Sequence, residues 1–188
     1  CINDALDSTE GRDMIYTISV QGHGKYPSEK VIENPEIEVL RAPTEELRWK
    51  YEYYVNQIYE MDKFIGELTA ELAKRDEPTV LVMYGDHIPA IDITEDDLES
   101  GDLYGTQYII WDNFGMKKDD ENLHTYQLAA HVMDMLDMQV GTIFTYQQNH
   151  KNSETYLSDL KALGYDMLYG KYYIYGGTNP FEPTNLKM

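Results

Sequence analysis

The chain has 188 residues, of which 42% are hydrophobic, and this is enough to bury the core of one domain of ordinary size. Its 34 Asp and Glu against 15 Lys and Arg give a net charge of −19, which argues against a nucleic-acid partner and against attachment to anionic lipid through basic residues. A single Cys excludes an internal disulfide, and no apolar run is long enough to span a membrane. We expect a single domain over residues 1–188. Because the first residue is not Met, a mature form, a proteolytic piece and a part cut from a longer protein all stay open.

The first forty residues combine polar stretches with one apolar run. Residues 1–13 are polar and are expected to be extended or flexible, as is the turn-rich tail at 176–188. Residues 14–20 (MIYTISV) form a short unbroken apolar run, which predicts a strand covered on both faces. Residues 21–43 form a connection longer than most loops, and such loops are usually functional or disordered.

Residues 44–75 carry the clearest periodicity of the chain. Apolar and aromatic side chains recur there at alternating steps of three and four, which predicts one face of a helix. Thr44 is a suitable N-cap, and Pro78 prevents the helix from continuing. The stepping also suits a coiled coil, but the flanking strands favour a crossover helix packed on a sheet. The face consists of Tyr51, Tyr54, Ile58, Met61, Ile65, Leu68 and Leu72.

A second apolar run at 79–84 (TVLVMY) predicts another strand after this helix. Strand, helix and strand in this order predict a right-handed parallel crossover. The alternation continues along the chain and indicates an α/β layered sandwich with a mainly parallel sheet. The remaining expected elements are a strand at 106–111, a helix at 125–138, a short helix at 154–163 that ends at Gly164, and an edge strand at 172–175.

Two glycine-bearing loops follow the first two predicted strands, and both carry candidate functional side chains. Parallel strands end at the same edge of a sheet, where ligands bind in open α/β sheets. We therefore expect His23, in the Gly22-His23-Gly24 loop, on the same edge as Asp86 and His87 of the Gly85-Asp86-His87 loop.

Asp86 and His87 pair a hard oxygen with a borderline nitrogen, a combination that suits Mn²⁺, Zn²⁺ or Mg²⁺. Gly85 allows the sharp turn that two adjacent ligands need. The alternative is a plain turn, in which Asp86 caps the backbone and His87 is solvated. For His23 the alternative is an exposed loop histidine.

The other histidines and the acidic segment are not chosen as sites. His124, His131 and His150 are interpreted as packed or surface residues. The acid-rich segment 92–102 does not have the spacing of a calcium loop and is interpreted as a solvated loop.

Several segments resemble the sulfatase-like phosphoglycerol transferases, which include lipoteichoic acid synthase, within the alkaline phosphatase superfamily. The resembling segments occur in the family's order and cover most of the chain. They are IYTISVQGHGKYP at 15–27, YYVNQIYEMDKFIGEL at 53–68, VLVMYGDHIPA at 80–90, YDMLYGKYY at 165–173 and YGGTNPFEPTNLKM at 175–188.

The resemblance implies an α/β/α sandwich of which this chain is the C-terminal half. One divalent ion, typically Mn²⁺, is held in this family by a Glu, a nucleophilic Thr and an Asp-His pair; Mg²⁺ and Zn²⁺ stay open. Asp86 and His87 match the pair, and His23 matches the histidine that contacts the substrate phosphate. Nothing in the chain resembles the Glu or the Thr, so no catalytic nucleophile is expected here and the chain by itself is expected to be inactive.

For the parent protein the resemblance implies transfer of phosphoglycerol from a phosphatidylglycerol-type lipid to a glycolipid or polymer of the cell envelope. The implied partners are an anionic phospholipid head group and that acceptor, with no nucleic acid. N-terminal transmembrane helices would anchor the domain at the extracellular face of the bacterial cytoplasmic membrane. Two alternatives stay open: a hydrolase of sulfate or phosphate esters on the same scaffold, and a noncatalytic extracellular module that binds anions or metal.

Overall fold

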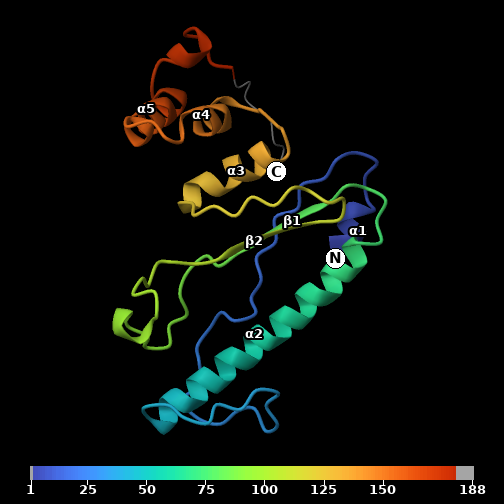
Figure 1. Ribbon diagram of the computed structural model, residues 1–188, viewed down its shortest axis with the longest axis vertical. Coiled ribbons are helices and arrows are strands. Elements are labelled where there is room, and N and C mark those ends of the chain that lie inside the picture. The colour runs from blue at the N-terminus through green and yellow to red at the C-terminus, as the bar shows by residue number, and fades with distance from the viewer. Residues whose placement is uncertain (1, 181–188) are drawn as a thin grey trace, which may run out of the picture. The chain divides into compact units, whose positions relative to one another are not determined.

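The computed structural model describes residues 2–180, and the chain divides into two compact units (Figure 1). The first unit reaches to Phe114 and the second begins at Gly115. The expectation of one domain stays a prediction, because compactness of the parts does not test whether they fold together. In the described residues no helix is both long and apolar enough to cross a membrane.

The first unit is built around one long unbroken helix (Figure 1). The Thr44 hydroxyl accepts a hydrogen bond from the Leu47 amide at 3.1 Å, which confirms the predicted N-cap. A short helix occupies part of 1–13, where an extended segment was expected. The elements of this unit are α1 (Ile2–Leu6), α2 (Glu45–Leu72), β1 (Val80–Tyr84), the 3₁₀ turn η1 (Glu95–Asp97) and β2 (Tyr108–Asp112).

Two polar side chains are buried on α2 and bind the long connection at 21–43. The Asn56 amide both accepts from the Ile37 N–H at 3.0 Å and donates to the Ile37 carbonyl at 2.8 Å. The Glu52 carboxylate accepts from the Val39 N–H at 3.1 Å. These contacts satisfy backbone groups that a loop would otherwise leave to water. The helix therefore packs on the loop that precedes it, through polar as well as apolar groups. The predicted parallel crossover is wrong for the described residues, because no strand forms before the helix and the two strands that follow it are antiparallel.

The two strands pair antiparallel, from Val80 opposite Asp112 to Tyr84 opposite Tyr108. The parallel arrangement predicted for the sheet is wrong for this pair. A parallel pair needs a crossover, usually a helix, whereas the connection at 85–107 contains only the 3₁₀ turn η1. Antiparallel neighbours need no such crossover.

The strand predicted at 14–20 does not form, since no ladder in the described part of the chain includes these residues. Its side chains are exposed instead: Met14 is 91%, Ile18 74% and Val20 79% accessible. A strand requires a partner for its backbone groups and a cover for its apolar faces. Among the described residues no strand pairs with this segment, and its apolar side chains stay uncovered.

The second unit is helical. The helices predicted at 125–138 and 154–163 are present, although the latter continues through Gly164, and α4 was not predicted. The edge strand expected at 172–175 is wrong: left-handed backbone at Tyr172 (φ 57°) and Gly176 (φ 69°) bounds a 3₁₀ turn there. Residues 181–188 of the predicted tail lie outside the described residues. The elements are η2 (Thr125–Gln127), α3 (Leu128–Met135), α4 (Thr142–His150), α5 (Tyr156–Leu168) and η3 (Tyr173–Tyr175).

A row of stacked rings runs through the second unit. The centroids are 4.8 Å apart for His150 and Tyr146, 5.8 Å for Tyr146 and Tyr156, 6.3 Å for Tyr156 and Tyr126, and 5.2 Å for Tyr126 and His124. Such stacks stabilise the fold beyond the contribution from burying the apolar area of the rings. They join α4 to the start of α5 and to η2.

In the first unit, one side chain fixes the end of α2 to the start of β1. The Asn113 Oδ1 accepts from the Thr79 N–H at 2.8 Å, and its Nδ2 donates to the carbonyls of Leu72, Arg75 and Glu77 at 3.0 to 3.2 Å. The Asn113 N–H also donates to the Thr79 carbonyl at 3.2 Å. The turn between helix and strand thus depends on one amide.

The substitution Asn113→Ala is expected to lower the free energy of unfolding by about 2–3 kcal/mol, because it leaves several backbone groups without their partner. Urea unfolding followed by the fluorescence of Trp49 and Trp111 measures this directly. Asn34→Ala, at an exposed loop position of the same unit, is the control and should change stability by less than about 0.5 kcal/mol. Equal effects of the two substitutions would contradict the role of Asn113.

Candidate functional site

The structure brings the His23 and His87 side chains into contact. Their ring centroids are 5.6 Å apart and their planes meet edge to face at 80°. His87 follows β1, whereas His23 lies in the glycine-bearing loop ahead of α2, and both side chains are exposed. Asp86 is adjacent to His87, so the three residues chosen from the sequence lie at one place in the first unit. Their functional roles stay predictions.

The His23 loop is positioned by α2 and not by a strand. The Gly22 backbone has a left-handed φ of 82°, and a Cβ there would lie 3.4 Å from the Ile58 side chain of the helix. The Tyr26 hydroxyl donates to the Gly22 carbonyl at 2.5 Å, and the Tyr26 ring packs edge-on against Tyr54. The turn closes with a hydrogen bond from the His23 N–H to the Val20 carbonyl at 3.1 Å. Packing against α2 therefore positions His23, whereas the sequence predicted that a parallel strand at 14–20 would position it.

The Asp86–His87 pair has the local geometry of two metal ligands. The His87 Nδ1 lies 3.0 Å from the Ile88 carbonyl, which can only accept, so the proton belongs on Nδ1 and a lone pair is left on Nε2. That Nε2 is 3.7 Å from the Asp86 Oδ1. Two ligands of one ion with bonds of about 2.1 Å lie roughly 3.0–3.5 Å apart, so a small side-chain rotation would suffice. A carbonyl on the other imidazole nitrogen is also the usual support of a metal-bound histidine.

Gly85 lies in close contact with Thr106, in the segment that leads into β2. A Cβ at this position would come within 2.6 Å of the Thr106 Oγ1, a distance that real Cβ atoms do not show. A side chain at Gly85 would thus require the Thr106 side chain or the backbone turn that presents Asp86 and His87 to shift.

A tyrosine pair beside this loop connects the exposed segment 14–20 to β1. The Tyr16 and Tyr84 hydroxyls are 3.3 Å apart. The hydrogen bond with Tyr16, followed by burial and by the negative charge of Asp86, raises the pKa of Tyr84. The Tyr84 phenol therefore ionises less readily than an ordinary tyrosine.

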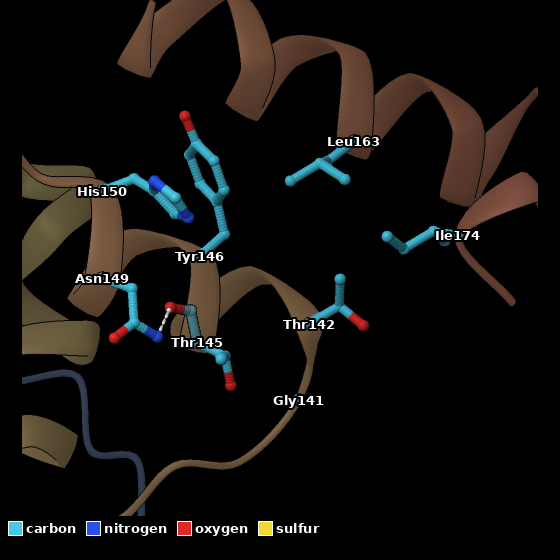
Figure 2. Close-up of a pocket in the computed structure, with 8 residues that line it drawn as sticks. All are labelled: Gly141, Thr142, Thr145, Tyr146, Asn149, His150, Leu163 and Ile174. Carbon is cyan, nitrogen blue, oxygen red and sulfur yellow. Dashed lines mark hydrogen bonds between the residues drawn. The ribbon is translucent and has the colours of Figure 1, made fainter. Parts of the chain in front are cut away.

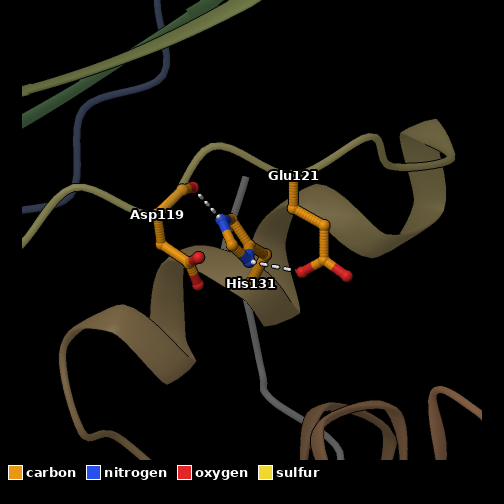
Figure 3. Close-up of side chains that lie close together, drawn as sticks. All are labelled: Asp119, Glu121 and His131. Carbon is orange, nitrogen blue, oxygen red and sulfur yellow. Dashed lines mark hydrogen bonds and ion pairs between the residues drawn. The ribbon is translucent and has the colours of Figure 1, made fainter.

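A cluster of three potential metal ligands lies in the second unit. It consists of Asp119, Glu121 and His131 (Figure 3), and it is the one such cluster found in the part of the chain that the structure describes. Sequence reasoning set His131 aside as a packed or surface residue. The available signal was the acidic run at 119–121, but only the fold of the intervening loop shows that His131 reaches it.

A shallow groove of about 540 Å³ lies in the second unit (Figure 2). It contains none of the site residues predicted from the sequence. Figure 2 shows Tyr146 and His150 on one side and Leu163 and Ile174 on the other. The remaining lining residues are Gly141, Thr142, Thr145 and Asn149.

Comparison with known proteins identifies the family. A family model described as Sulfatase matches residues 2–138, more than half of the chain. The chain belongs to the sulfatase family. This match confirms the predicted resemblance and the α/β fold class of the alkaline phosphatase type, and it places the chain in a family of enzymes.

One solved structure is similar to this sulfatase-family chain. It is the Streptococcus pyogenes phosphoglycerol transferase GacH in complex with sn-glycerol-1-phosphate, with a TM-score of 0.65 and 22% sequence identity. The match covers 76% of this chain and 41% of that chain, so our chain spans less than half of its neighbour. At this identity the likeness shows the shared fold. A search of curated proteins gave no match.

The contact of Gly85 with Thr106 can be tested by a substitution at Gly85 and a compensating substitution at Thr106. Gly85→Ala should destabilise the first unit by about 1–3 kcal/mol, because the new methyl group overlaps the Thr106 hydroxyl. Thr106→Ala removes that hydroxyl, so the double variant should recover most of the loss. Urea unfolding of the four proteins measures the coupling between the two positions. If the losses of stability in the two single variants simply add in the double variant, the contact with Thr106 does not constrain Gly85.

Proposed function

We propose that this chain is the carboxyl-terminal part of the catalytic domain of a metal-dependent transferase, which moves phosphoglycerol from a phosphatidylglycerol-type lipid to a glycolipid or polymer of the cell envelope. The observation that carries the proposal is the contact of His23 with His87, beside Asp86. Membership of the sulfatase family supports it, as does similarity to GacH, which is a phosphoglycerol transferase and binds sn-glycerol-1-phosphate.

Asp86 and His87 would hold a divalent cation. Mn²⁺ is the typical ion of the family that the sequence resembles, although Mg²⁺ and Zn²⁺ also suit the two donors. A bound dication lowers the pKa of a hydroxyl nucleophile and neutralises charge on phosphate oxygens. His23, in contact with the His87 ring, would donate a hydrogen bond to a non-bridging oxygen of the same phosphate. These positive groups are needed because the chain's net charge of −19 repels an anionic head group.

The proposed active site would be completed by a part of the parent protein that contributes the nucleophilic Thr and a Glu ligand. The chain corresponds to 41% of GacH, and Asp86 and His87 supply two ligands where stable sites use three or more. The exposed apolar side chains of Met14, Ile18 and Val20 suit a strand in a larger sheet, which the remainder of the domain would cover. We place the parent at the extracellular face of the cytoplasmic membrane, with its anchor outside this chain.

The first functional test uses the full-length parent, incubated with phosphatidylglycerol and separately with generic phosphate and sulfate esters. Diacylglycerol release from the lipid is expected. The 188-residue chain by itself should be slower by several orders of magnitude, because it lacks the covalent nucleophile. Turnover of sulfate esters alone would replace the transferase proposal by the hydrolase alternative, and diacylglycerol release by the isolated chain would show that its catalytic residues are misassigned.

The second test separates metal binding from phosphate binding in the complete domain. Asp86→Ala removes an anionic ligand and should abolish Mn²⁺ binding at micromolar concentration, whereas His23→Ala should bind Mn²⁺ normally and lose affinity for glycerol phosphate. Calorimetric titration of both variants with Mn²⁺, and then with glycerol phosphate, measures the two effects. If Asp86→Ala binds Mn²⁺ as tightly as the parent, the loop after β1 is only a turn.

A further inference from the structure

The cluster in the second unit brings together three side chains that the proposed transferase chemistry does not use. Asp119 and Glu121 lie in the loop before η2, and His131 lies on α3 (Figure 3). One ligand atom from each residue falls within 4.8 Å of the other two. The His131 side chain is only 4% exposed, so its ring is held by packing, while the Asp119 carboxylate is at the surface.

The hydrogen bonding of His131 orients its ring for ligation. Its Nε2 lies 3.3 Å from the Asp119 backbone carbonyl, which only accepts, so Nε2 carries a proton and a neutral ring has its lone pair on Nδ1. That Nδ1 faces the Glu121 carboxylate at 3.7 Å, too far for a hydrogen bond. The separation is close to the roughly 3.5 Å between two ligands of a tetrahedral ion. A backbone carbonyl on the other ring nitrogen is the usual support of a metal-bound histidine.

The charges around this position favour a dication. Lys151 donates to both oxygens of Glu121, at 2.9 and 3.2 Å. This bond lowers the pKa of Glu121, and the carboxylates of Glu121, Asp119 and Asp134 together raise the pKa of Lys151. Three carboxylates against one ammonium leave a local charge of −2 when the imidazole is neutral. Lys151 thus partly neutralises the cluster and would compete with a metal ion for Glu121.

A small cavity adjoins the cluster, and one of its lining residues has a buried oxygen without a hydrogen-bond donor. The cavity, of about 20 Å³, is lined by Glu121, His131 and Gln148 among others, and has room for about one water molecule or ion. The Gln148 Nε2 donates to the Met138 carbonyl at 2.9 Å, while its Oε1 is shielded from solvent and has no hydrogen-bond partner among the described residues. The cavity therefore offers space for a cation or for its bound water next to the Glu121 and His131 side chains.

We propose that Asp119, Glu121 and His131 form a binding site for one divalent cation of borderline hardness, with Zn²⁺ favoured by a donor set of one imidazole and two carboxylates. The site would join the loop before η2 to α3 and would release Lys151 from Glu121.

The test is a calorimetric Zn²⁺ titration of the 188-residue chain that carries Asp86→Ala and His87→Ala, so that the loop after β1 contributes nothing. One equivalent of Zn²⁺ should bind. Adding Glu121→Gln should weaken the affinity by more than about tenfold, and so should Asp119→Asn, which changes an exposed side chain and leaves packing intact. Glu154→Gln, at another exposed acidic position of the second unit, is the matched control and should have no effect.

Two further measurements separate a metal site from an ion pair that only stabilises the fold. Lys151→Met should tighten Zn²⁺ binding by about three- to tenfold, because it removes a competing positive charge. The Nδ1 resonance of His131 should shift on Zn²⁺ addition, as expected for a coordinated nitrogen. The absence of Zn²⁺ binding, an unchanged affinity in Glu121→Gln or Asp119→Asn, or weaker binding in Lys151→Met would overturn the proposal and leave His131 as a packed imidazole between two acceptors.

Discussion

Four backbone groups at the junction of α2 and β1 depend on the amide of Asn113. Because Asn113 directly follows β2, the same side chain ties both strands to the end of the helix. The pairing of β1 with β2 then fixes the position of β1 as far as Tyr84, the residue that directly precedes the Gly85-Asp86-His87 loop. The His23 loop rests on the same helix through Tyr26 and Tyr54. The meeting of His23 with His87 is thus a consequence of how α2 is fixed at its end and packed along its length.

Local patterns predicted the elements that local physics determines. The three–four spacing and the Thr44 cap located α2 nearly to the residue, and the apolar runs located β1 and β2. The relative direction of two strands depends on the connection between them. The sequence of the connection at 85–107 contains no clear signal that β2 runs antiparallel to β1. The roles of Glu52 and Asn56 were not predicted, because periodicity counts apolar positions, whereas the partners of these two side chains are backbone groups of the preceding loop.

The candidate site was predictable for a different reason. His23, Asp86 and His87 stand in glycine-bearing loops after apolar runs, and their order matches a known family, so composition and resemblance both pointed to them. The expected mechanism of convergence, two parallel strands ending at one edge, was wrong, although the residues converge. Asp119, Glu121 and His131 have no such signal: His131 lies ten positions after Glu121, and only the turn into α3 brings their side chains together.

The uncovered segment 14–20 has a consequence for the behaviour of the chain in solution. Its seven residues, MIYTISV, contain no charge, no proline and no glycine, and they expose apolar side chains on a backbone that pairs with no strand of the described residues. Such a segment can pair with a copy of itself and start ordered aggregation. Mutual repulsion from the net charge of −19 opposes that encounter at neutral pH. Near the isoelectric point of about 4.4 the repulsion disappears, so mild acid removes the main barrier to self-association through these seven residues.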